Sequence, residues 1–257
     1  MKALLVIDVQ NDFLPGGSLE VKDGNNIISK INEIMSNYDL IVATKDWHPQ
    51  NHMSFASNHS NKSVGDIINL NGLDQILWPD HCVEDSYGSK FPEELNTNKI
   101  DKIIYKGTKT DVDSYSGFND NAKDTSTELS SFLKDKRINK LDCVGLATEY
   151  CVKYTALDAI KEGFSSRVIM RCTKGINQND IENAINEMRL KGIVIIKFSL
   201  DSIKFINSTT LDEYPHSLSY QLTNFTNLLF SIIPASASNI DVLESPRKSV
   251  DTTASSV

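Results

Sequence analysis

"KALLVID", residues 2–8, is the first of six short apolar runs that decide the fold class. The other five are "DLIVAT" (39–44), "DKIIYKG" (101–107), "LDCVGLA" (141–147), "SSRVIMR" (165–171) and "GIVIIKF" (192–198). The runs are apolar on both faces instead of alternating with polar residues, which is typical of buried strands in a parallel sheet. Helical patterns lie between them, and this alternation favours an α/β fold. The sequence therefore predicts a doubly wound, mainly parallel six-stranded sheet with helices on both faces, in three layers.

Four stretches between the runs have helical spacing, namely 25–37, 126–136, 147–163 and 178–192. In the first, Ile27, Ile31 and Ile34 form one apolar stripe. The last two end on Gly163 and Gly192, and glycine is the residue most often found just after a helix C-terminus.

Length and composition narrow the class of protein. A chain of 257 residues can bury one sizeable core, and a net charge of −8 without a basic stripe argues against a nucleic-acid partner. No apolar run approaches the roughly 20 residues that span a bilayer, so no membrane insertion is expected. The four cysteines form no CxxC pair, and polar residues follow too soon after the N-terminus for a signal peptide. We therefore expect a cytoplasmic protein.

The expected layout has three parts. Residues 1–200 carry the α/β pattern, within which 48–100 and 107–125 read as long loops, and long ordered loops are commonly functional. Residues 201–233 form a C-terminal extension that either packs as an extra helix or mediates assembly. Residues 234–257 are rich in serine and poor in large apolar side chains, which is typical of a disordered tail.

Polar residues follow four of the predicted strands. Asp8, Asp46 and Lys106 lie at the ends of three runs, and Cys151 lies about one helical turn beyond a fourth. The carboxyl ends of parallel strands meet at one edge, where α/β proteins bind ligands. Taken singly, each residue has a plainer interpretation, such as a buried apolar cysteine or a solvated lysine. Because all four residues are expected at the same edge of the sheet, we favour the interpretation that they form one catalytic site.

Cys151 is the candidate nucleophile of this group. Thr148 is expected to cap the helix that follows, which would place the sulfur at the positive helix end and lower the pKa of the thiol. The free N–H groups there could also hold an oxyanion. Asp8 is the expected base, with Lys106 beside it.

"TKDWHPQNHMSF", residues 44–55, is the candidate metal-binding segment. Asp46 and His48 are two residues apart, so on an extended segment they face the same way. Pro49 disfavours a helix here, which excludes the i, i+4 histidine pair of a HExxH site. A further histidine, His81 in "WPDHC" (78–82), would complete a site for a zinc-like or iron-like divalent metal.

Five motifs together carry a family resemblance: "LLVIDVQNDFLPGGSL" (4–19), "TKDWHPQNHMSF" (44–55), "WPDHCV" (78–83), "YKGTKTDVDSYSGF" (105–118) and "GLATEYCVKYTALDA" (145–159). In this order they resemble the nicotinamidases, also called pyrazinamidases, of the isochorismatase-like cysteine hydrolase superfamily, whose fold is Rossmann-like. The resemblance runs from residue 1 to about residue 200 and is missing from the C-terminal part.

The resemblance implies a role for each matched residue. Asp8, Lys106 and Cys151 match the catalytic triad. Asp46, His48 and His81 match the ligands of one divalent metal ion, zinc first, with iron or manganese as alternatives. His52 matches a histidine that is a ligand in some members only, so its role stays open. The backbone N–H groups of Ala147 and Cys151 match the oxyanion hole, beside a cis peptide bond at Leu146–Ala147. Phe13, Trp78 and Tyr115 match aromatic residues around the substrate ring.

The implied function is hydrolysis of nicotinamide to nicotinate and ammonia through a cysteine thioester, in NAD salvage, with pyrazinamide as a second substrate. Two alternatives stay open. One is another cysteine amidohydrolase of the superfamily, acting on a ureido or N-carbamoyl substrate. The other is a non-catalytic scaffold that kept the fold. The substrate is expected to be a small molecule, and assembly into a homo-oligomer stays open.

Overall fold

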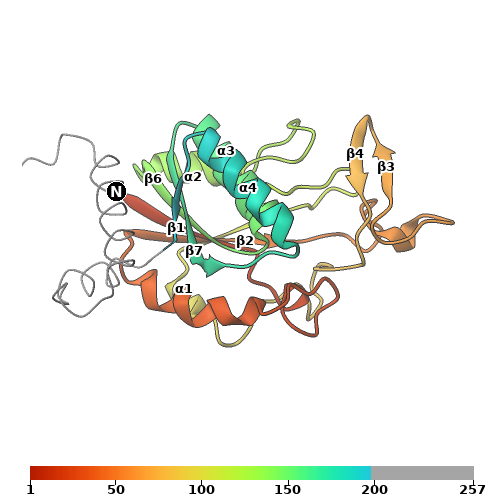
Figure 1. The fold of residues 1–257 in the computed structure, drawn as a ribbon, viewed down its shortest axis with the longest axis horizontal. Helices are drawn as coiled ribbons and strands as arrows, with labels where there is room; N and C mark the ends of the chain where they lie inside the picture. Colours follow the sequence, from red (N-terminus) through yellow and green to blue (C-terminus); the bar gives the residue numbers. More distant parts are fainter. Residues whose placement is uncertain (198–257) are drawn as a thin grey trace, which may run out of the picture. The chain divides into compact units, whose positions relative to one another are not determined.

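The structure, a computed structural model, describes residues 1–197. Six strands form one sheet in the order β5-β2-β1-β6-β7-β8 (Figure 1). Their bounds are β1 Lys2–Ile7, β2 Leu40–Asp46, β5 Lys102–Lys106, β6 Lys140–Gly145, β7 Ser165–Thr173 and β8 Val194–Ile196. All neighbouring pairs are parallel, and each strand lies on one of the six apolar runs, so the predicted sheet is confirmed. The proposed extension (201–233) and tail (234–257) lie outside the described residues.

Helices cover both faces of the sheet. Helix α1 (Ile28–Met35) lies on one face, while α2 (Leu129–Asp135), α3 (Lys153–Lys161) and α4 (Gln178–Leu190) lie on the other (Figure 1). Strand β1 is buried on both sides: Leu5 packs into the α2–α4 core and Leu4 into the α1 core. This explains why the strands read as continuous apolar runs, because neither face meets water.

Two helices end as their glycines predict. Gly163 after α3 and Gly192 after α4 have φ values of +90° and +85°, in the region that glycine adopts most readily. The residue after each glycine donates its N–H back to the last turn, Phe164 to Ala159 O and Ile193 to Met188 O, as in a Schellman motif. These bonds satisfy helix carbonyls and turn the chain into the next strand.

The central pair of strands meets at an unusually close backbone contact. Ile7 in β1 is paired with Gly145 in β6, and Gly145 has φ +115°. A Cβ atom on Gly145 would lie 2.0 Å from the carbonyl oxygen of Ile7, which is far inside van der Waals contact. Only glycine therefore fits at this point of the sheet.

We expect Gly145→Ala to lower the free energy of unfolding by about 3 kcal/mol, because it adds a backbone clash to an unfavourable φ. The measurement is chemical denaturation followed by circular dichroism. Gly163→Ala is the matched control, since it also has a positive φ but no atom within 4 Å of the added carbon. It should cost only about 1 kcal/mol. Equal losses in the two variants would contradict the role of the close contact.

The segment 48–100 is more ordered than the sequence prediction of a long loop. It contains an antiparallel hairpin of β3 (Ile67–Leu70) and β4 (Leu73–Ile76), joined by Asn71 and Gly72. Both connecting residues have positive φ values, 54° and 89°, and an Asn-Gly pair between short strands is a strong hairpin signal. The hairpin lies beyond the carboxyl ends of the central strands (Figure 1). Short 3-10 helices occur at Asn11–Phe13, Gly24–Ile27, Ala56–Asn58 and Thr97–Lys99.

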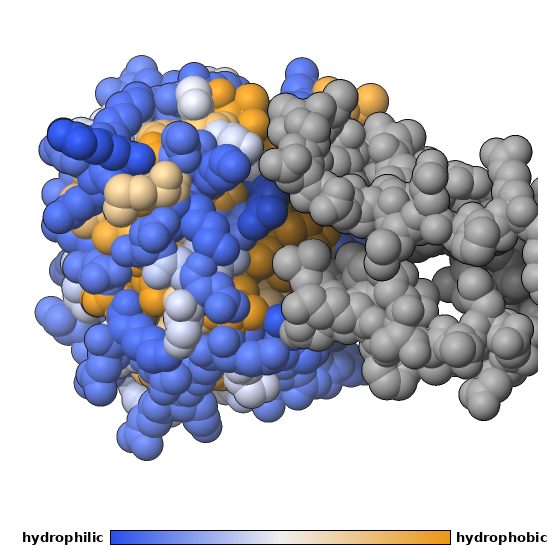
Figure 2. Space-filling view, turned by 90° about the vertical axis from the view of Figure 1, so that its left-hand side faces the viewer, coloured by the Kyte–Doolittle hydropathy of each residue, from blue (hydrophilic) through white to orange (hydrophobic). Residues whose placement is uncertain are grey.

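The exposed surface in Figure 2 is mainly hydrophilic, with hydrophobic residues in scattered patches. Within residues 1–197, none of the helices combines the length and the apolar character that crossing a membrane requires.

Candidate active site

The carboxyl ends of the central strands carry the predicted polar side chains. Asp8 directly follows β1, while Asp46 ends β2 and Lys106 ends β5, where the two residues are register partners. Strands β1 and β6 are neighbours although the chain passes through β2 and β5 between them. Their shared end is therefore a topological switch point, the place where open α/β sheets bind ligands.

Lys106 is the centre of a buried cluster. Its Nζ lies 2.9 Å from Asp8 Oδ2 and 3.4 Å from Cys151 Sγ, and it forms a close ion pair with Asp46 Oδ1. It also donates to the carbonyl oxygen of Ser114 at 2.8 Å. Burial works against the ammonium form, but Asp46 and Asp8 outweigh it and hold the pKa of Lys106 well above its ordinary value. A fixed positive charge therefore stands beside the sulfur.

The Asp8 carboxylate is held on both sides. Thr44 donates its hydroxyl to Asp8 Oδ1 at 2.5 Å, and the other oxygen faces Lys106. The backbone N–H of Asp8 in turn donates to Thr44 Oγ1 at 3.2 Å. Asp8 is fully buried, and one of its carboxylate oxygens lies within 4.8 Å of Cys151 Sγ. It is thus the carboxylate placed to exchange a proton with the thiol.

Cys151 lies in a π-helical turn, Thr148–Val152, that leads into α3. Two predictions about this turn are wrong. The N-cap position is Ala147, not Thr148, and no side chain caps the turn. The thiol pKa is raised well above its ordinary value, because desolvation by burial outweighs the lowering by Lys106. The resting group is therefore a thiol, which makes a neighbouring base necessary.

Ala147 precedes this turn and lines the same pocket as Cys151. The peptide bond between Leu146 and Ala147 is cis, as the resemblance implied. The Ala147 N–H donates to no group within residues 1–197, although the residue is 93% buried. A free buried donor beside the sulfur is the arrangement that an oxyanion hole requires.

Three candidate metal ligands converge next to Lys106. One ligand atom from each of Asp46, His48 and His81 lies within 4.8 Å of the others. The Nδ1 atoms of His48 and His81 each lie 2.8 Å from a backbone carbonyl, Gly107 O and Pro79 O. Each ring therefore donates through Nδ1–H and leaves the Nε2 lone pair for a metal, the usual arrangement of metal-bound histidine.

The environment of these two rings also suits a metal. Burial lowers the pKa of both His48 and His81 to about 4, so the imidazoles are neutral at pH 7. His48 Nε2 is buried and has no hydrogen-bond partner among the described residues. An orphaned acceptor of this kind is costly unless a cation fills the space. The donor set of two imidazoles and a carboxylate fits zinc, iron or manganese.

His52 differs from the other two histidines in its hydrogen bonds. Its ring lies 4.3 Å from that of His48 between centroids, but its Nδ1 accepts the backbone N–H of Ser54 at 3.2 Å. A neutral ring that accepts at Nδ1 carries its proton on Nε2. In this state His52 presents a donor, not a lone pair, toward the cluster. The Nδ1 contact therefore favours the three-ligand set. His52 Nε2, however, has no hydrogen-bond partner among the described residues, as is also true of His48 Nε2, and His52 shares a second candidate cluster with His48 and Asp113, so its role stays open.

The three predicted aromatic residues share one pocket with the cluster. Phe13, Trp78 and Tyr115 line it together with Cys151. Trp78 donates Nε1–H to the Tyr115 hydroxyl at 3.2 Å, which fixes both rings. Sequence reasoning missed a fourth ring, that of Tyr150, which packs edge-on against Trp78 with centroids 5.2 Å apart. The pocket is therefore a narrow, largely apolar slot that ends at polar groups.

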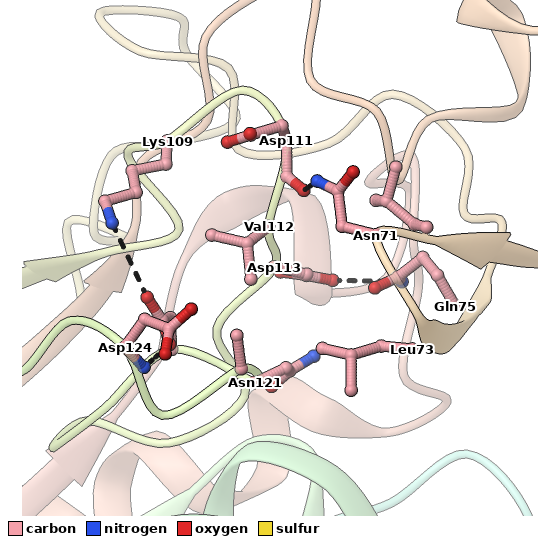
Figure 3. Close-up of a pocket in the computed structure, with 12 residues that line it drawn as sticks. Asn71, Leu73, Gln75, Lys109, Asp111, Val112, Asp113, Asn121 and Asp124 are labelled. Carbon is pink, nitrogen blue, oxygen red and sulfur yellow. Dashed lines mark hydrogen bonds and ion pairs between the residues drawn. The ribbon is translucent and has the colours of Figure 1, made fainter.

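Asp113 is a second wall residue that sequence reasoning missed. Its Oδ2 accepts from Gln75 of β4 at 3.3 Å and its Oδ1 from the N–H of Ser114 at 2.7 Å. Figure 3 shows Gln75 and Asp113 directed toward each other in the lining of a second hollow, to which Asn71 also belongs. The hairpin thus holds Asp113 in the pocket wall through the hydrogen bond from Gln75. Asp113 lies in an irregular segment without a periodic pattern, so no sequence signal distinguished it.

Comparison with known proteins then decides the family. Residues 2–198, the part that carries the sheet and the cluster, match the isochorismatase domain. The chain belongs to the isochorismatase family. The predicted fold class and the family resemblance are therefore confirmed.

Curated relatives and solved structures of the isochorismatase family place the chain within one branch. It is 43% identical to a nicotinamidase of Acinetobacter baylyi, over 74% of this chain and 90% of the relative. A yeast nicotinamidase structure bound to the inhibitor nicotinaldehyde is 34% identical, with a TM-score of 0.74 over 77% of this chain and all of that one. A pyrazinamidase of Pyrococcus horikoshii in complex with zinc is 39% identical, with a TM-score of 0.61 over 77% and 99%.

Proposed function

We propose that this isochorismatase-family protein is a nicotinamidase that hydrolyses nicotinamide to nicotinate and ammonia, in NAD salvage. One observation carries the proposal: Cys151 lines the same aromatic-lined pocket as Asp46 and His81, two of the three candidate metal ligands. A substrate in this pocket can present a flat ring to the aromatic walls and an amide carbon to the sulfur. The relatives named nicotinamidases support this choice of substrate. Pyrazinamide, with a similar ring and amide, is the second expected substrate.

The proposed acylation step uses the buried triad. Asp8 removes the proton of the Cys151 thiol, because one of its carboxylate oxygens lies within 4.8 Å of the sulfur. The thiolate then attacks the amide carbon, while Lys106 keeps a positive charge 3.4 Å from the sulfur. The amide oxygen becomes an oxyanion that the N–H groups of Ala147 and Cys151 stabilise. The proton on Asp8 then passes to the leaving nitrogen, and ammonia departs.

The deacylation step reuses the same carboxylate. Asp8 deprotonates a water molecule, which attacks the thioester carbon. The Cys151 sulfur leaves and recovers a proton, and nicotinate is released. Lys106 holds Asp8 in place in both half-reactions through its 2.9 Å contact.

Asp46, His48 and His81 are proposed to hold one divalent metal ion, with zinc first and iron or manganese as alternatives. The zinc complex of the Pyrococcus horikoshii relative supports this order. When bound, the metal supplies a coordination position for the pyridine nitrogen, which orients the carboxamide over the sulfur. Neutral imidazoles with free Nε2 atoms are the form in which histidine binds metal.

We expect removal of the metal to lower ammonia release from nicotinamide at least about tenfold, because substrate orientation contributes much of such a rate. The measurement compares the untreated protein with protein dialysed against a chelator. Adding back zinc, iron or manganese should restore the rate and rank the metals. Full activity of protein that elemental analysis shows to be free of metal would contradict the proposal.

The same assay separates the two alternatives. Faster ammonia release from an N-carbamoyl or ureido compound than from nicotinamide would favour another amidohydrolase of the superfamily. Release from none of these compounds by metal-loaded protein would favour a non-catalytic scaffold. Cytoplasmic location, the domain boundary near residue 200 and assembly into a homo-oligomer stay predictions from the sequence.

A further inference from the structure

Glu149 is a buried charged residue that the proposed mechanism does not use. Its side chain is in the same π-helical turn as Cys151, and the residue is only 4% exposed. Its Oε1 accepts two backbone N–H groups, those of Ile176 at 2.6 Å and Asn177 at 2.9 Å. A carboxylate buried in this way must be held by its hydrogen bonds, since leaving it unpaired is costly.

The loop that donates these two bonds, residues 174–177, fits closely around the carboxylate. A Cβ atom on Gly175 would lie 2.1 Å from Glu149 Oε2, so only glycine leaves room for the side chain. The N–H of Thr148 also donates to the carbonyl oxygen of Lys174 at 2.9 Å. The 174–177 loop is thus attached to the turn that carries the nucleophile by three hydrogen bonds.

Ile176 extends from this loop into the candidate active site. It lines the pocket together with Ala147 and Cys151. The residue is 46% exposed, so part of its side chain is open to a ligand. An exposed isoleucine at a pocket wall gains free energy when a flat apolar ligand covers it.

We propose that Glu149 is a positioning residue that holds Ile176 as an outer wall of the pocket, and that Ile176 selects small, flat aromatic amides by contact with their ring. The inference deepens the proposed function and rests on it. Glu149 acts through the 174–177 loop and touches no reacting atom. Its charge also lies just before the N-terminus of α4, whose dipole favours an anion there.

A double-mutant cycle on the full chain with its metal tests this coupling. We expect Ile176→Ala to raise KM for nicotinamide about tenfold, which corresponds to about 1.4 kcal/mol, with kcat changed less than about threefold. Glu149→Ala should raise KM at least as much, and the double variant should not exceed Glu149→Ala. Glu182→Ala, which removes an exposed glutamate from α4, is the matched control and should leave KM unchanged. The proposal would be overturned if the rise in KM of the double variant equalled the product of the two single rises. It would also be overturned if Ile176→Ala left KM unchanged.

Two further measurements distinguish positioning from general damage. Glu149→Gln keeps an acceptor for the N–H groups of Ile176 and Asn177, so it should restore KM to within about threefold of the parent. Hydrogen exchange at these two amides should quicken in Glu149→Ala and return toward the parent rate in Glu149→Gln. Unchanged exchange in Glu149→Ala would overturn the positioning role. Hydrogen exchange is measured without substrate, so it tests the positioning role of Glu149 independently of activity. If the parent protein did not hydrolyse nicotinamide, the proposed function would be refuted, but the exchange result would still test the positioning role.

Discussion

Replacement of Cys151 by alanine should lower kcat/KM for nicotinamide by about 10⁴-fold or more, the size of effect seen when an enzyme loses its nucleophile. The reason is that no other described group can form the thioester: within residues 1–197 the remaining cysteines, Cys82, Cys143 and Cys172, do not line the pocket. The fold should persist, because the ammonium of Lys106 keeps Asp8, Asp46 and the Ser114 carbonyl as partners. The measurement is steady-state ammonia release together with the thermal midpoint.

The matched control is Cys143→Ala, which removes a buried thiol from β6 on the same core and outside the pocket. It should lose some stability and keep kcat/KM within a few-fold of the parent. Residual hydrolysis by Cys151→Ala within tenfold of the parent would refute the assignment of the nucleophile. Equal losses of activity in both variants would instead point to damage of the core.

The sheet could be predicted from the sequence because its signal is local. Runs such as 2–8 and 141–147 are apolar on both faces, and only a sheet covered by helices on both sides buries both. The edge that carries Asp8, Asp46 and Lys106 followed from the same reasoning, since parallel strands share one carboxyl end. The β3–β4 hairpin was also signalled, by Asn71-Gly72, but its short strands alternate only weakly and were missed.

The features of the site that could not be predicted from the sequence depend on burial and on contacts between segments that are distant in the chain. The raised pKa of Cys151 comes from desolvation, which the helix-end argument left out. Glu149 bonds to backbone groups 27 and 28 residues later in the chain, and Asp113 meets Gln75 from a separate hairpin. Neither contact follows from the spacing or type of the residues. His52 looked equal to His48 in sequence, and only its bond from Ser54 separates the two rings.

Replacement of His48 by alanine should remove the metal and weaken substrate binding together. His48 is one of the three proposed ligands, and its buried Nε2 has no hydrogen-bond partner among the described residues. Loss of a group that only hydrogen-bonds to a metal ligand already costs about 10- to 100-fold in metal affinity, so loss of the ligand itself should cost more. The metal content by elemental analysis should fall well below one per chain, and kcat/KM for nicotinamide should fall by more than about 100-fold.

Two other histidines make this experiment specific. His59→Ala is the matched control, because His59 bonds through Nε2 to the Met53 carbonyl and belongs to none of the candidate metal clusters. His52→Ala is the discriminating variant, since a ring that accepts at Nδ1 carries its proton on Nε2 and should not be a ligand. Both variants should keep about one metal per chain. Stoichiometric metal in His48→Ala would refute the ligand set, and metal loss in His52→Ala as large as in His48→Ala would add a fourth ligand to it.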